Sequence, residues 1–268
     1  MRDMWAIGDA YEAYVGRWSR RVAKEFLRWL DVPGGRHWLD VGCGTGALTE
    51  AILAVADPGL VVGVDPAEGF LADARARVVD PRASFQTGDA RSLPQADRRF
   101  HAVVSGLALN FVPDEHQAAA ESARVATVDG VVAAYVSDYT DGMAMMRYFW
   151  DAATALDADA AALDEGQRFP LCQPEPLREL WTRTGLAQVA VRSIEIDTAF
   201  ANFDDYWTPF LGGQGPAPAY TMSLTQEHRD ALRELLRTRL PTGPDGTIAL
   251  TARVWAVRGV VKDGRTTQ

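Results

Sequence analysis

Two patterns of apolar residues alternate along the chain, and their order predicts an α/β fold. Short apolar runs, replaced in 188–196 and 247–257 by alternating apolar and polar residues, are separated by segments whose apolar residues recur every three or four positions. The first pattern is typical of strands buried on both faces of a parallel sheet, and the second predicts helices that cover it. The predicted strands are 37–41, 60–64, 83–86, 102–105, 131–136, 188–196 and 247–257. The predicted helices are 18–30, 47–56, 70–79, 114–125, 143–163, 175–183 and 226–239.

A stretch rich in aromatic residues, glycine and proline separates the last two predicted strands, at residues 200–220. It is too long for a simple connector, and loops of this length inside compact domains are commonly lids or binding loops. Two interpretations stay open: a binding loop, or an irregular surface patch packed by its own aromatic rings.

The charge balance excludes some partners. The chain has 268 residues, 47% of them hydrophobic, and a formal net charge of −9, with a pI near 5.0. Non-specific nucleic-acid binding and binding to anionic membranes both need dense positive charge. We therefore expect neither a nucleic-acid nor a membrane partner.

The sequence also shows no membrane-spanning segment, signal peptide or metal-binding motif. The longest apolar runs fall far short of the roughly 20 residues of a membrane span, and residues 1–14 have no apolar stretch typical of a signal peptide. Two cysteines, Cys43 and Cys172, indicate a reduced, cytoplasmic protein rather than a disulfide framework. Four scattered histidines show no metal-ligand spacing, so we expect no metal.

The strongest chemical signal is a glycine turn that follows the first predicted strand, at residues 39–46. Gly42, Gly44 and Gly46 let a backbone approach a ligand closely, and the helix beyond them offers unpaired N–H donors. Asp65 ends the next predicted strand, 23 residues after Gly42, where a carboxylate can accept hydrogen bonds from both ribose hydroxyls. The pattern predicts a nucleoside-containing ligand and leaves a nicotinamide dinucleotide open.

Two further features narrow the choice. Asp40 precedes the glycine turn where a nicotinamide site normally keeps an apolar residue, and Gly88-Asp89-Ala90 follows the third predicted strand. With these motifs the sequence resembles the class I S-adenosylmethionine-dependent methyltransferases, and within them the bacterial type-11 group that includes ubiquinone and menaquinone methyltransferases. The motifs that carry the resemblance are 39–46, 61–66, 88–94, 108–113 and 130–136.

The resemblance implies a site for S-adenosylmethionine and its product S-adenosylhomocysteine. It implies that Asp40 orders the turn and supports the methionine amine, and that Gly42, Gly44 and Gly46 pack against the methionine and ribose parts. It also implies that Asp65 with Pro66 holds the ribose, and that Asp89 and the Ala90 amide hold the adenine. At the amino-acid end, it implies contacts from the backbone around Ser105 and Leu107 and an ion pair between the carboxylate and Arg20, with Arg17 and Arg21 as rivals.

No catalytic residue is assigned from the sequence. A hydroxyl acceptor needs a general base, whereas an activated carbon or a neutral amine does not. Candidate bases are His116, which we expect at the surface, His101, which we expect at the wrong end of its strand, and the pair Asp138 and Tyr139 after the fifth strand. The segment after the fourth strand contains no Asn-Pro-Pro-Tyr motif, which would favour methylation of nucleic-acid or protein amides. Phe111 in this segment is a candidate for the wall of the acceptor pocket.

Together these inferences predict a doubly wound, Rossmann-like sheet of seven strands, the last antiparallel, in a single methyltransferase domain over residues 1–268. Residues 36–138 form its cofactor-binding core, 1–35 an N-terminal helical cover, and 197–246 a lid or acceptor insertion before the last strand. We expect a monomer or homodimer that methylates a small-molecule acceptor. An NAD(P)-dependent oxidoreductase and a non-catalytic cofactor-binding module remain the alternatives.

Overall fold

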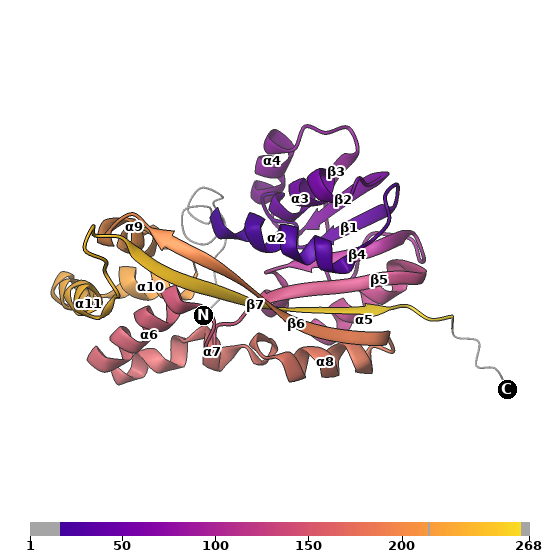
Figure 1. Ribbon diagram of the computed structural model, residues 1–268. Coiled ribbons are helices and arrows are strands. Elements are labelled where there is room, and N and C mark those ends of the chain that lie inside the picture. The colour runs from indigo at the N-terminus through magenta and orange to yellow at the C-terminus, as the bar shows by residue number, and fades with distance from the viewer. Residues whose placement is uncertain (1–16, 214, 264–268) are drawn as a thin grey trace. The chain divides into compact units, whose positions relative to one another are not determined.

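The computed structural model describes residues 17–213 and 215–263 (Figure 1). Its strands form one seven-stranded sheet in the order β3-β2-β1-β4-β5-β7-β6. The strands are β1 (His37–Val41), β2 (Leu60–Asp65), β3 (Ala83–Thr87), β4 (Phe100–Gly106), β5 (Ala126–Ser137), β6 (Ala187–Phe200) and β7 (Ile248–Val260). All seven predicted strands are therefore present.

The direction of the strands also agrees with the prediction. The first five strands pair in parallel, with Leu39 of β1 opposite both Val62 of β2 and Val103 of β4. Strand β7 runs antiparallel to β5, because the Asp129 N–H donates to the carbonyl of Val261, while the Asp138 N–H donates to that of Arg253. The sheet is thus doubly wound with an antiparallel last strand.

The described residues also form α-helices (Figure 1). They are α2 (Arg17–Leu30), α3 (Ala47–Val55), α4 (Glu68–Arg77), α5 (Glu115–Val125), α6 (Ala144–Leu156), α7 (Glu165–Arg168), α8 (Pro174–Arg183), α9 (Phe203–Trp207), α10 (Pro216–Ser223) and α11 (Gln226–Arg239). Helix α5 begins at the predicted cap, where the Asp114 carboxylate accepts the Gln117 N–H at 3.0 Å. Residues 1–16 of the predicted N-terminal cover lie outside the described residues.

The chain divides into two compact units. The first, here called the sheet unit, comprises Ser19–Val136, Gln173–Ile194 and the chain from Trp255 onward. Of the described residues, the second, here called the helical unit, comprises Arg17 and Trp18, Ser137–Cys172 and Glu195–Val254. The predicted insertion 197–246 therefore falls in one unit with the helices that follow β5.

The aromatic stretch between β6 and β7 is folded rather than loop-like. It forms α9, the 3₁₀ helix η5 (Thr208–Gly212) and α10. The rings of Phe149 and Phe210 stack at 4.4 Å between centroids, and the Tyr206 hydroxyl donates to the carbonyl of Met145 at 2.8 Å. Of the two interpretations left open for this stretch, the irregular surface patch is wrong, since these rings lie in a core that they share with α6. A lid role for the segment stays a prediction.

Candidate cofactor site

The glycine turn connects β1 to α3, as predicted. Gly42, Gly44 and Gly46 all have positive φ, at 73°, 52° and 86°, which L side chains rarely adopt. Their surroundings differ. A Cβ at Gly42 would lie 2.5 Å from the Cβ of Ala108, whereas a Cβ at Gly44 would meet no atom within 4 Å. Gly44 therefore borders open space, the place where a ligand can approach the backbone.

Asp65 ties the end of β2 to this turn. One carboxylate oxygen accepts the Gly44 N–H at 3.0 Å, and the other accepts the Ala67 N–H at 2.9 Å, on the far side of Pro66. Burial raises the pKa of Asp65, and these two backbone hydrogen bonds oppose the rise. Each carboxylate oxygen can accept a further hydrogen bond. The side chain can thus serve both the turn and a hydroxyl-bearing ligand.

Asp40 lies beneath the turn and is fully buried. Its Oδ2 accepts a hydrogen bond from the Thr49 hydroxyl at 2.7 Å, while Oδ1 has no hydrogen-bond partner among the described residues. Burial, and to a lesser degree the charge of Asp65, raises the pKa of Asp40 to about 7 against the effect of the Thr49 bond. A buried carboxyl oxygen without a donor is unfavourable, so the position favours an additional donor.

Asp89 follows β3 and is more exposed than the other two carboxylates. Arg91 donates to it from Nη2 at 2.6 Å and from Nε at 3.0 Å, and these bonds lower the pKa of Asp89. The sequence interpretation missed this arginine, although its spacing of two residues was a signal for a local ion pair. Asp89 is consequently an acceptor already held by a neighbouring cation.

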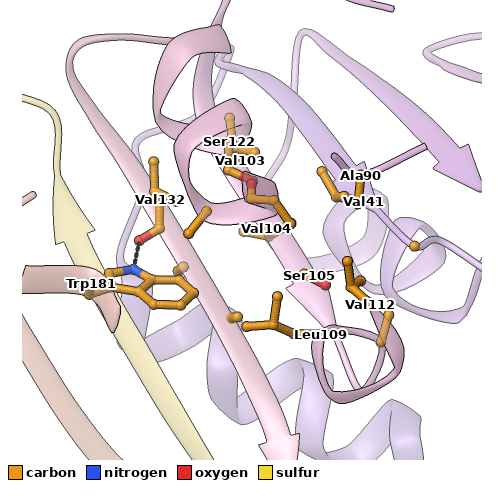
Figure 2. Close-up of a pocket in the computed structure, with 16 residues that line it drawn as sticks. Val41, Ala90, Val103, Val104, Ser105, Leu109, Val112, Ser122, Val132 and Trp181 are labelled. Carbon is orange, nitrogen blue, oxygen red and sulfur yellow. Dashed lines mark hydrogen bonds between the residues drawn. The ribbon is translucent and has the colours of Figure 1, made fainter. Parts of the chain in front are cut away.

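An apolar pocket lies between α5 and strands β4 and β5 (Figure 2). Three residues of the predicted cofactor site, Gly42, Ala90 and Ser105, line it together. Trp181 of α8 forms another part of its wall, and its indole N–H donates to the carbonyl of Val132 at 2.9 Å (Figure 2). The lining also includes Ala108 and Val132, so the fold brings the first, third, fourth and fifth predicted motifs to one place. Phe111 is not among the lining residues of this pocket.

The segment after β4 is tightly constrained. Leu107 has a positive φ of 59°, and its N–H donates to the carbonyl of Tyr135 at 2.8 Å. The next residue, Ala108, packs against Gly42. The backbone that the resemblance assigns to the amino-acid end of the cofactor is therefore held by both the glycine turn and β5.

Arg20 lies beside the helix that follows the turn. Its Nε donates to Glu50, in the first turn of α3, at 3.1 Å. The predicted pairing of Arg20 with a ligand carboxylate stays a prediction. The side chain of its rival Arg17 lies outside the described residues.

The candidate bases have structural positions that restrict their use. His101 Nδ1 accepts the N–H of His37, at the start of β1 and so at the end opposite the glycine turn, and burial lowers the pKa of His101. His116 is exposed in the first turn of α5. Asp138 is buried, and Arg253 donates to it at 2.7 Å. No local pattern indicates this pairing, because the two residues are 115 positions apart.

Three further observations concern metal ligands, membrane-spanning helices and the two cysteines. Among residues 17–213 and 215–263, no group of three or more His, Cys, Asp or Glu side chains could hold a metal ion. No helix in those ranges is both long and apolar enough to cross a membrane. Cys43 and Cys172 are both buried.

Comparison with known proteins adds an independent finding. The family described as "Methyltransferase domain" matches residues 39–134. The chain is 38% identical over 113 residues to a demethylmenaquinone methyltransferase of Shouchella clausii, covering 41% of this chain and 48% of that protein. It is 34% identical over 97 residues to a trans-aconitate 2-methyltransferase of Variovorax paradoxus, covering 36% of this chain and 37% of that protein. The chain thus spans about half the length, or less, of these curated relatives.

Similarity to solved structures extends over most of the chain. A structure described as a putative methyltransferase from an antibiotic biosynthesis pathway of Anabaena variabilis superposes with a TM-score of 0.61 at 20% identity, covering 91% of this chain and 98% of that one. At this identity the likeness shows the fold alone. It agrees with the doubly wound sheet described above.

Proposed function

We propose, from the premise that the chain belongs to the class I S-adenosylmethionine-dependent methyltransferases of the type-11 group, that it transfers a methyl group from S-adenosylmethionine to a small-molecule acceptor. The observation that carries the proposal is the glycine turn, where Gly44 borders open space beside the carboxylate of Asp65. The reported relatives are methyltransferases, which favours this reaction over hydride transfer by an oxidoreductase.

The residues present fit the cofactor. A bare backbone at Gly44 leaves room for a ligand that a side chain would occupy. Asp40 Oδ1 is a buried acceptor that lacks a donor among the described residues, and the cofactor amine is a donor of suitable charge. A site with room for the ligand and an unmet acceptor is typical of a binding site rather than of a packed core.

The role proposed for each residue is the one that the family resemblance implies. Asp65 accepts hydrogen bonds from the ribose hydroxyls, and the amide of Ala90 with Asp89 holds the adenine. The backbone at Ser105 and Leu107, with Arg20, holds the amino-acid end. Bound there, the cofactor supplies a methyl group made electrophilic by its sulfonium, so the protein mainly positions the reactants and excludes water.

The acceptor that we favour is a quinone-type small molecule. The support is the name of the Shouchella clausii relative, a demethylmenaquinone methyltransferase. Because an electron-rich ring carbon needs no strong base, this choice agrees with the engagement of Asp138 by Arg253. We further propose a cytoplasmic monomer or homodimer without a nucleic-acid partner, in line with the acidic composition.

The test compares ligands and then acceptors. S-adenosylhomocysteine should raise the melting temperature, and NADH should not, since ligands stabilise the state that binds them. Stabilisation by NADH alone would support the oxidoreductase. The protein with S-adenosylmethionine and a panel of reduced quinones and carboxylic acids should then form S-adenosylhomocysteine. Binding without product across the whole panel would favour the non-catalytic module.

A further inference from the structure

The segment after β4 adopts a backbone conformation that its sequence does not favour. Six non-glycine residues among those described have positive φ, and three of them are aspartates, which tolerate it. Leu107 is the one apolar residue of the six. A leucine persists in this conformation where its surroundings determine it. The segment is consequently held in place from outside.

Tyr135 of β5 supplies two of the contacts that hold it. Its carbonyl accepts the Leu107 N–H at 2.8 Å. In the parallel register it lies opposite Gly106, where an added Cβ would come within 2.5 Å of the tyrosine hydroxyl and 2.7 Å of the ring carbon Cζ. The ring therefore lies directly over the Gly106 backbone, and only glycine fits beneath it.

The tyrosine itself is fixed by its surroundings. It is 2% exposed, and its ring lies 4.8 Å from the ring of Phe26 in α2. Buried aromatic pairs of this geometry restrict ring movement. A shift at position 106 is thus passed to the backbone of β4 and Leu107 more readily than to the ring.

From these contacts we infer that Tyr135 is a positioning residue: its ring over Gly106 sets the backbone of Ser105 to Ala108 in the conformation that binds the amino-acid end of the cofactor. The inference rests on the proposed function. Tyr135 does not belong to the predicted site. Its side chain would nevertheless control the backbone of Ser105 and Leu107, which does. Tyr135 and Gly106 should therefore act as a coupled pair in cofactor affinity.

The experiment is a double-mutant cycle in the full chain, read by calorimetric titration of S-adenosylhomocysteine. Gly106→Ala places a methyl group against the ring and should weaken binding by about tenfold or more, because small misplacements of a binding backbone are costly. Tyr135→Leu removes the atoms that would meet this methyl group. In the Tyr135→Leu background, adding Gly106→Ala should then change affinity less than about twofold.

A matched control separates positioning from stability. Gly259 in β7 is also crowded, since a Cβ there would lie 2.8 Å from that of Leu186, and it belongs to no predicted motif. Gly259→Ala should lower the melting temperature and leave affinity unchanged. If Gly106→Ala does not fold, the double variant tests the pair instead: it should fold and bind S-adenosylhomocysteine within about twofold of Tyr135→Leu, and failure to do so would overturn the inference.

The outcomes are distinguishable. Wild-type protein that does not bind S-adenosylhomocysteine would overturn the proposed function and this inference with it. Wild-type binding that Gly106→Ala leaves unchanged, or an equal loss from Gly106→Ala in both backgrounds, would overturn the inference alone.

Discussion

The two compact units bury acidic side chains in different ways. In the sheet unit, Asp40 is fully buried and one of its oxygens has no hydrogen-bond partner among the described residues. In the helical unit, Glu165 is 2% exposed and accepts the indole N–H of Trp150 at 2.5 Å. Burial is the main cause that raises the pKa of each to about 7.

The difference shows that burial alone does not identify a functional carboxylate. Glu165 lies in a unit whose aromatic rings pack on one another, whereas Asp40 lies under a turn with open space at Gly44. The first environment is arranged for packing and the second for a ligand. Substitutions in the two units should separate these roles.

The largest effect is expected in the core of the helical unit. Phe149→Ala removes a fully buried ring that stacks on Phe210, and should lower the free energy of unfolding by about 3–5 kcal/mol. Affinity for S-adenosylhomocysteine should persist, because the predicted cofactor residues all belong to the sheet unit. Urea denaturation and calorimetry measure the two quantities. A loss of binding with stability retained would contradict this separation.

The next effect is a pH dependence due to Asp40. Its pKa is about 7 in the fold against 3.8 as the ordinary value, so its contribution to stability is fully present below pH 4 and is lost as the pH rises through 7. Asp40→Asn should remove this loss, which amounts to about 1.4 kcal/mol for each pKa unit. Denaturation of both proteins at pH 4 to 8 measures it, and parallel curves would refute the assignment.

Glu165→Gln is the matched control for Asp40. It should remove a similar pH dependence of stability, since Glu165 has a pKa of about 7 for the same main reason. Only Asp40→Asn should also change how S-adenosylhomocysteine affinity depends on pH. If both variants change it equally, the two carboxylates do not differ in role.

A smaller effect is expected at Asp65. Asp65→Ala removes an acceptor for ligand hydroxyls and for the N–H groups of Gly44 and Ala67. Affinity for S-adenosylhomocysteine should fall by about 1–3 kcal/mol, the scale of a lost charged hydrogen bond. Calorimetry measures this, and an unchanged affinity would remove Asp65 from the site.

The smallest effect is expected at Asp89. Its carboxylate is 45% exposed and paired with Arg91, and solvent screens such groups. Asp89→Ala should weaken binding by less than about 1 kcal/mol, measured in the same way. A loss larger than that of Asp65→Ala would reverse the order of importance proposed for the two residues.

Most of the sheet could be predicted from the sequence because most strands have a local pattern of their own, either an apolar run or an alternation of apolar and polar residues. Strand β5 began five residues earlier than predicted, since Asp129 and Gly130 interrupt its apolar pattern. The glycine turn, Asp40 and Asp65 could be predicted equally well, because they are recognised from motifs of residues that are close together in the sequence.

What could not be predicted depends on contacts distant in sequence. The helices after β5 join those between β6 and β7 in one unit through rings such as Phe149 and Phe210, and no local pattern records that pairing. The same holds for Asp138 with Arg253. The hydrogen bond from Thr49 to Asp40 lies between these two cases. The two residues are close in sequence, but they meet only because the glycine turn places the first turn of α3 over the end of β1.

The most direct test of the central claim is a crystal structure of the protein with S-adenosylhomocysteine. We expect the ribose hydroxyls to lie within hydrogen-bond distance, about 3 Å, of the Asp65 carboxylate, with the ligand passing over Gly44. Ligand bound elsewhere, with the space at Gly44 empty, would contradict it.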